Sequence, residues 1–178
     1  MLAPRLPLQD SESFSNLFAR THLHIFRFIY GLHGGPLEEV EDLTSDTYSR
    51  AWKGRNQFSG DENDALCWLF TIARHLVIDA HRKNRIHLND ATETLENATL
   101  DAMFLSTELT PEEQATNREQ FTHLWELLQN LQDDRREMLV LRYILGWQVK
   151  QIAKFLNMQE NTVSVYIRRS LEQIRNDW

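Results

Sequence analysis

Residues 64–85 read DALCWLFTIARHLVIDAHRKNR, and their apolar side chains recur at the three- and four-residue intervals of one amphipathic helix. The last turn carries three cations, which either complement the helix macrodipole or serve in binding. The helix alone favours neither interpretation. Its expected buried stripe is Leu66, Leu69, Phe70, Ala73, Leu76, Val77 and Ala80, and its cations are Arg82, Lys83 and Arg85.

The composition indicates a folded, soluble, cytoplasmic protein. Of the 178 residues, 42% are hydrophobic and 10% aromatic, which is enough for packed cores. A single cysteine, Cys67, excludes an internal disulfide and fits a reducing cytosol. No stretch approaches the roughly 18–20 apolar residues of a spanning helix, and the N-terminal residues lack a signal-peptide core. We therefore expect no membrane insertion.

The net charge of −7 is unevenly distributed along the chain. Residues 1–85 contain ten Lys/Arg and eleven Asp/Glu, and residues 118–178 contain nine and eight. Residues 86–117 contain seven acids and no Lys or Arg. This pattern predicts two nearly neutral domains, 1–85 and 111–178, joined by a flexible acidic linker over 86–110.

The first half of the chain is expected to be all-helical. Helical periodicity covers Ser11–Leu32, with Asp10 or Ser11 as N-cap and Phe18 among the buried residues. After a break at His33–Pro36, a second helix covers Leu37–Lys53, and Gly54–Asn63 has the composition of a loop. No run with the two-residue period of a strand appears, so the fold class is all-α.

The second half contains a helix-turn-helix pattern. Thr110-Pro111 is a typical helix start, Asp133 begins a later helix, and an apolar stripe between them includes Leu124. Residues 149–156 and 161–176 then form two helices around a turn in which Asn157 is expected to adopt the left-handed conformation. The small Ala153 allows the two helices to cross closely. Expected inward residues of the second helix are Val163, Ile167, Ser170, Leu171 and Ile174.

Together these features resemble a bacterial RNA polymerase sigma factor of the extracytoplasmic-function (ECF) type, in the sigma-70 family. The resemblance rests on the order and spacing of two blocks of motifs. The first block comprises 41–48 (EDLTSDTY), 50–52 (RAW), 58–60 (FSG) and 68–74 (WLFTIAR) with Asp79; the second comprises Leu139, Leu141, Arg142, 151–153 (QIA), Leu156 and 162–163 (TV).

The resemblance implies that the first domain binds core polymerase through the outer face of its second helix. Carboxylates suit this role because they pair with basic side chains and steer association. Ser45 stands where the family commonly has Gln, so one contact is expected to differ. The implied polymerase-binding residues are Glu38, Glu41, Asp42, Ser45 and Asp46.

The resemblance also implies that the first domain reads the −10 element as a single strand, with one base turned out into a pocket. Aromatic rings stack on an unstacked base, and amide or imidazole groups read its edge. The implied pocket consists of Asn56, Phe58, Asp61, Asn63, Trp68, Arg74 and His75, with phosphates held by Arg82, Lys83 and Arg85. His75 stands where the family frequently has Asn.

The second domain is implied to bind the polymerase flap and to read the −35 element with its second helix in the major groove. Ser164 and Val165 occupy positions that usually carry basic or polar side chains, so reading is expected to depend on the arginines and the helix N-terminus. The implied −35 residues are Asn161, Thr162, Ser164, Val165, Arg168 and Arg169.

Other classes of protein fit the sequence less well. The acids of 38–46 have no matching ligands on another helix, and His22, His24 and His33 lack zinc spacing, so we expect neither metal nor cofactor. Without a Gly-rich phosphate loop, HExxH or GxSxG, the chain is not expected to be an enzyme. Two interpretations remain beside the sigma factor: a free-standing helix-turn-helix regulator, and a sigma-like protein held chiefly by an inhibitor. Expected partners are core polymerase, promoter DNA and an anti-sigma or other inhibitor protein.

Overall fold

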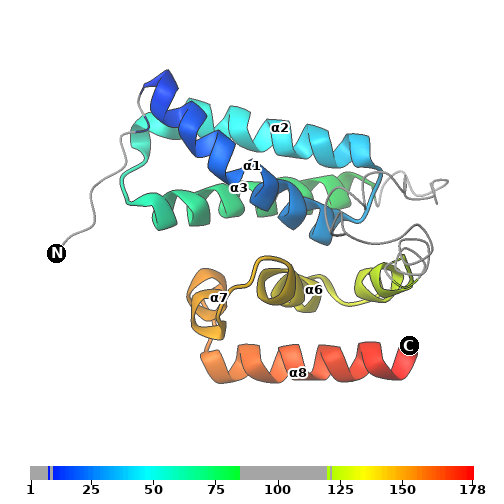
Figure 1. Ribbon diagram of the computed structural model, residues 1–178. Coiled ribbons are helices and arrows are strands. Elements are labelled where there is room, and N and C mark those ends of the chain that lie inside the picture. Colours follow the sequence, from blue (N-terminus) through cyan, green and yellow to red (C-terminus); the bar gives the residue numbers. More distant parts are fainter. Residues whose placement is uncertain (1–7, 9, 85–119, 121) are drawn as a thin grey trace, which may run out of the picture. The chain divides into compact units, whose positions relative to one another are not determined.

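The computed structural model describes residues 8, 10–84, 120 and 122–178, and every regular element within these residues is a helix (Figure 1). The chain divides into two compact units, the first made of Met1–His33 with Glu38–Asp90, and the second of Gly34–Leu37 with Ala91–Trp178. The prediction of an all-α fold with two helical domains is confirmed. The predicted linker 86–110, the helix start at Thr110 and the phosphate ligand Arg85 lie outside the described residues.

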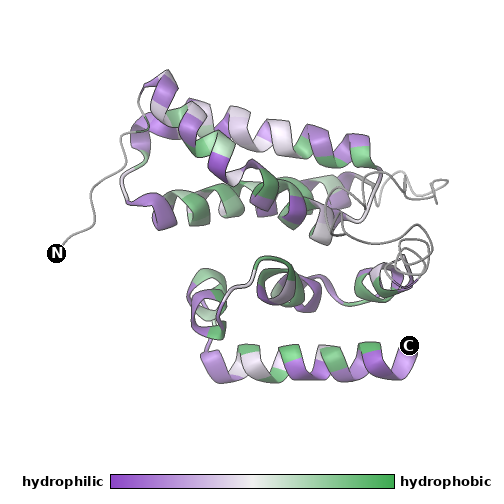
Figure 2. Ribbon diagram, in the orientation of Figure 1, coloured by the Kyte–Doolittle hydropathy of each residue, from purple (hydrophilic) through white to green (hydrophobic). Residues whose placement is uncertain are grey.

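The first unit consists of α1 (Ser11–His33), α2 (Leu37–Gly54) and α3 (Glu62–Asn84), with a short 3₁₀ turn η1 (Arg55–Gln57) after α2. Phe28 of α1 packs edge-on against Phe70 of α3, with ring centroids 4.8 Å apart. Figure 2 shows α2 largely in purple and white, whereas α3 has long green stretches. The core of this unit therefore lies mainly along α1 and α3.

The apolar stripe of α3 is buried, but it begins one residue earlier than predicted. Leu69, Phe70 and Ala73 are fully buried as predicted, but the line begins at Ala65, and Leu66 is only half-buried. Ala65, Leu69 and Ala73 follow a four-residue spacing. The two alanines at the ends of this line have small side chains, which allow α1 to approach closely.

The seam between α1 and α2 is aromatic and includes one buried hydrogen-bond chain. The hydroxyl of Thr21 donates to the Leu17 carbonyl at 2.7 Å, so the Tyr48 hydroxyl is the donor in its 2.8 Å bond to Thr21 Oγ1. Burial raises the pKa of Tyr48 to about 12. Phe18, predicted to be buried, is 42% exposed because its ring lies at the edge of this seam, 4.7 Å from that of Tyr48.

Local polar contacts define where α1 begins and ends. The Ser13 amide donates to Asp10 Oδ1 at 2.8 Å, which identifies Asp10 as the N-cap and holds the pKa of its carboxyl below the ordinary value. After α1, Gly34 has φ +65°, a value that favours glycine. Across this turn the buried ring of His33 bonds Glu39 through Nε2 at 2.8 Å.

The second unit contains a helix over residues 122–129, then α6 (Asp133–Leu139), which continues as a π-helical segment, η2 (Val140–Ile144). The helix-turn-helix follows as α7 (Val149–Leu156) and α8 (Glu160–Asp177). Asn157 lies in the left-handed region with φ 53°, so the prediction for the turn is confirmed, and Ala153 is buried. Leu124 and Leu171, expected to be buried, are 41% and 40% exposed because they lie on the flanks of their helices.

Arg136 joins the consecutive helices of this unit. Its guanidinium donates to the carbonyls of Leu128, Gln129 and Leu131 at 2.8–3.2 Å, at and just after the end of the helix 122–129, where a helix has few amide donors for its last carbonyls. Burial lowers the pKa of Arg136, an effect that nearby Asp133 opposes. A single buried cation therefore positions the helix that precedes the helix-turn-helix.

Candidate functional site

The outer face of α2 presents the predicted acidic residues to solvent. Glu38, Glu41, Asp42, Ser45 and Asp46 are all exposed. The opposite face buries Thr44 and Thr47, whose hydroxyls donate to the carbonyls of Val40 and Leu43 at 2.7 and 2.8 Å. Because these threonines satisfy their hydroxyls within the helix, α2 keeps a buried face while all its carboxylates point outward.

Two residues of the loop between α2 and α3 pack against tryptophan rings, one on each helix. The Arg55 guanidinium lies 3.6 Å from the centroid of the Trp52 ring and donates to the Trp52 carbonyl. Phe58 stacks on Trp68 of α3, with centroids 5.1 Å apart and an interplanar angle of 25°. The structure therefore brings together two predicted pocket residues, Phe58 and Trp68, and adds Trp52 and Arg55, which were not among the predicted site residues.

Asp61 caps the start of α3. Asp64 donates its amide to Asp61 Oδ1 at 2.9 Å, and Asp61 donates its amide to Asp64 Oδ2 at 3.1 Å. A Cβ at Gly60 would lie 2.6 Å from that of Asp64, so glycine is needed beside this reciprocal cap. One oxygen of Asp61 is therefore engaged in capping rather than available to a ligand.

The remaining predicted −10 residues lie in the loop before α3 and along the outer side of that helix. Asn56 and Asn63 are exposed in and after the loop, and Arg74 is half-buried. His75 is exposed and lies seven residues after Trp68, which places it on the same side of the helix about 10 Å farther along the axis. A ligand that stacks on Phe58 and also meets His75 must therefore span roughly two helical turns.

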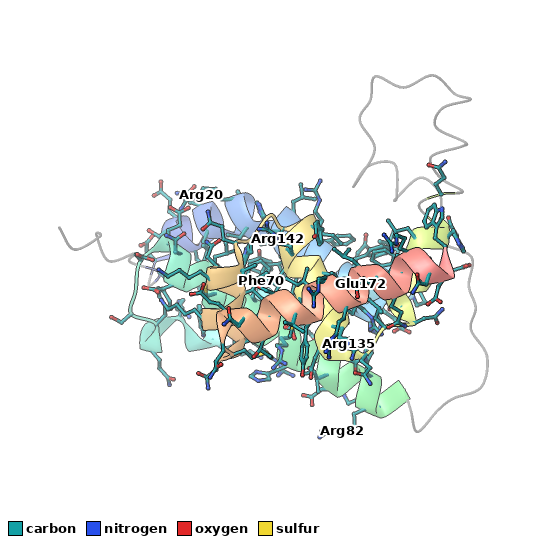
Figure 3. The ribbon with its side chains drawn as sticks, turned by 90° about the horizontal axis from the view of Figure 1, so that it is seen from below. Arg20, Phe70, Arg82, Arg135, Arg142 and Glu172 are labelled. Carbon is teal, nitrogen blue, oxygen red and sulfur yellow. The ribbon has the colours of Figure 1, made fainter. Side chains whose placement is uncertain are left out.

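The cationic end of α3 is accessible. Arg82 and Lys83 are exposed, and Arg82 forms a 3.4 Å ion pair with Asp79 one turn earlier. Such an exposed pair is readily exchanged for another anion. Figure 3 shows Arg82 extending from this end of the unit.

The outer surface of α8 carries the predicted −35 residues. Asn161, Ser164, Arg168 and Arg169 are exposed, whereas Thr162 and Val165 are half-buried. Arg168 lies 3.9 Å from Glu172 and its side chain is 70% exposed, so its guanidinium is free to turn toward a groove. Arg142 donates to the Trp147 carbonyl at 2.8 Å and thereby braces the segment that leads into α7.

Two other kinds of feature are absent from the residues that the structure describes. No group of three His, Cys, Asp or Glu side chains there is arranged to hold a metal ion. No helix in the same residues has the length and apolar character needed to cross a membrane.

Two family models match this chain, and together they cover more than half of it. "Sigma-70 region 2" matches residues 17–86, and "Sigma-70, region 4" matches residues 122–174. The first contains the acidic face of α2, the aromatic loop and α3, and the second contains the helix-turn-helix.

Curated proteins from Bacillus subtilis are similar to the chain over most of its length. The ECF RNA polymerase sigma factor SigX is 27% identical over 164 residues, which is 92% of this chain and 82% of SigX. The ECF RNA polymerase sigma factor SigW is 25% identical over 168 residues, 93% of this chain and 89% of SigW.

Two solved structures share the fold. The sigma factor RpoE of Bartonella quintana, in complex with the anti-sigma factor NepR, superposes with a TM-score of 0.65 at 18% identity and covers 93% of this chain and 96% of its own. CnrH, in complex with the cytosolic domain of CnrY, has a TM-score of 0.63 at 21% identity and covers 94% of this chain and 88% of its own.

Proposed function

The chain belongs to the sigma-70 family of RNA polymerase sigma factors and is of the ECF type, and on this basis we propose which of its residues bind polymerase and promoter DNA. It is an alternative sigma factor that directs promoter recognition. The exposed acidic face of α2 binds core polymerase, α3 and its preceding loop bind the −10 strand, and α8 reads the −35 element. Residues 1–85 and 111–178 serve as the two binding domains, with 86–110 as their linker.

One observation carries this assignment: within the first unit, the acidic surface and the cationic and aromatic surface lie on different helices. α2 presents only carboxylates and Ser45 at the five assigned positions, whereas α3 ends in exposed cations and begins beside stacked aromatic rings. A protein that bound only DNA would be repelled along α2. A protein that must hold a basic partner surface and a nucleic acid together needs both surfaces.

The −10 assignment gives a direct test with Phe58→Ala and His75→Ala. Base–aromatic stacking is worth roughly 1–3 kcal/mol by alanine substitution, so both changes should reduce open-complex formation about 5- to 160-fold. Core binding should stay normal, because neither residue lies on the acidic face of α2. Permanganate footprinting of the melted promoter measures the first effect and a pull-down of core polymerase the second. Unchanged melting in both variants would remove these residues from the site.

The −35 assignment separates base reading from phosphate anchoring. Arg168 lies one turn beyond Ser164 on the outer surface of α8, within reach of guanine in a major groove. Arg168→Ala should therefore relax preference at one or two −35 positions, by about 1–3 kcal/mol each. Transcription from a library of −35 variants measures this directly. A loss that is uniform over the library would show that Arg168 only holds the backbone.

An inhibitor protein is a further proposed partner. The two fold relatives described above are complexes with the anti-sigma factor NepR and with the cytosolic domain of CnrY. We place this chain in the cytoplasm, where core polymerase is located, and assign it no catalytic activity, because sigma factors are initiation factors rather than enzymes.

A further inference from the structure

We propose that Arg20 of α1 binds a phosphate of the displaced −10 strand, and that Glu62 holds its guanidinium in place until the strand arrives. This inference rests on the proposed −10 function and extends the strand site to a helix that the family resemblance did not assign to DNA.

Arg20 reaches the edge of the strand site from outside α3. Its Nη1 lies 2.8 Å from Glu62 Oε1, and its Nε donates to the Asn16 carbonyl at 3.3 Å. Glu62 stands between Asp61 and Asn63, both assigned to the −10 site. The side chains of Arg20 and Glu62 are 51% and 55% exposed, so an incoming anion has access to the pair.

A strand phosphate that passes the start of α3 needs a cation from outside the first turn of that helix. Asp61, Glu62 and Asp64 favour the N-terminus of the helix, but they repel the phosphates of a strand that passes over the loop. Among the α3 cations assigned to the strand, Arg74 lies about 18 Å farther along the helix axis, and Arg82 and Lys83 lie about 30 Å farther. Figure 3 shows Arg20 and Arg82 at opposite ends of this unit.

Arg20 is better suited to this role than Arg55, the arginine of the loop before α3. Arg55 is committed to the Trp52 ring and carbonyl, contacts that order the loop. Arg20, by contrast, has an exchangeable carboxylate partner, and an ion pair between half-exposed side chains contributes little to stability. Its planar guanidinium can exchange that carboxylate for a phosphate, which it binds with the same paired donors.

Substituting either member of the ion pair provides a test. Both substitutions remove the same ion pair, but only the substitution of Arg20 removes the cation that would bind phosphate. Holoenzyme assembled from the full chain is titrated with a fluorescent fork probe whose −10 non-template strand is single-stranded and which lacks a −35 element. Arg20→Ala should weaken binding about 3- to 10-fold and reduce the slope of log affinity against log salt by about 0.7, the value for one phosphate contact on a single strand. Arg20→Lys should retain most of the affinity.

Glu62→Gln is the matched variant, and it should bind the probe as tightly as wild type or more tightly, because it frees Arg20 and removes a negative charge. Arg175→Ala, which removes an exposed arginine of α8, should have no effect on this probe. Equal weakening by Arg20→Ala and Glu62→Gln would show that the ion pair only stabilises the unit. Binding by Arg20→Ala as tight as that of wild type would also overturn the proposal, whatever Glu62→Gln does.

The same probe distinguishes this inference from the function on which it rests. If Phe58→Ala and His75→Ala weaken binding while Arg20→Ala does not, only the role of Arg20 is wrong. If none of the three weakens binding, the −10 assignment itself is wrong.

Discussion

Replacing Asp42 and Asp46 together by lysine is expected to abolish binding to core polymerase. The two residues lie four apart on the exposed face of α2, so the double change puts like charges against a basic partner surface over a full helical turn. Like-charge juxtaposition at an interface costs several kcal/mol, which corresponds to a loss of affinity of about 100-fold or more. A pull-down with core polymerase, quantified against wild type, measures the loss.

The fold should survive this change, because both side chains are exposed and the buried face of α2 is untouched. Circular dichroism checks that helix content is retained. Glu172→Lys combined with Asp177→Lys makes the same change in net charge on exposed residues of α8, and this control should still bind core polymerase. If the Asp42/Asp46 variant is retained as well as wild type, the acidic face is not the polymerase-binding surface.

The second large effect concerns DNA binding by the isolated chain. Phosphate neutralisation supplies most non-specific affinity for DNA, yet each domain is nearly neutral and residues 86–117 add seven acids without one Lys or Arg. We expect a Kd for duplex promoter DNA of about 10⁻⁴ M or weaker at physiological salt. Specific binding should appear when core polymerase is added, because holding both domains at promoter spacing raises the effective concentration of each for its element.

Deleting residues 86–110 should strengthen DNA binding by the free chain and impair transcription. The deletion removes five of those acids, Asp90, Glu93, Glu96, Asp101 and Glu108, and it shortens the connection that lets both domains engage. Mobility-shift titrations with and without core polymerase measure both effects. Tight, sequence-specific binding by the intact chain alone would instead favour a free-standing helix-turn-helix regulator.

Helical periodicity was the most dependable guide to the fold. The helices whose ends lie within the described residues begin and end within about two residues of their predicted limits, because caps such as Asp10 and turn residues such as Asn157 act over one turn of chain. The predicted exposure of the five polymerase-binding residues is confirmed for the same reason: a strongly amphipathic helix has one face that can be buried.

Side chains at the edge of an apolar stripe were predicted less well. Phe18, Leu66, Leu124 and Leu171 all follow the helical repeat, but whether an edge residue is covered depends on the side chain that a neighbouring helix places beside it. Spacing within one helix contains no information on that neighbour. Ala65 was missed because a small residue at the edge of a stripe is buried only where another helix approaches closely.

The features that depend on neighbours along the chain could be predicted from the sequence alone: the helices, the left-handed turn at Asn157, the outward acids of α2, the cations that end α3 and the acidic stretch between two nearly neutral halves. Tertiary structure alone decided the contacts between residues far apart in the chain. It placed Phe58 on Trp68, put Arg20 against Glu62 and made Arg136 the cap of the preceding helix. The physical reason is that capping and periodicity act within a few residues, whereas stacking and ion pairing depend on distances that only the packing of separate helices sets.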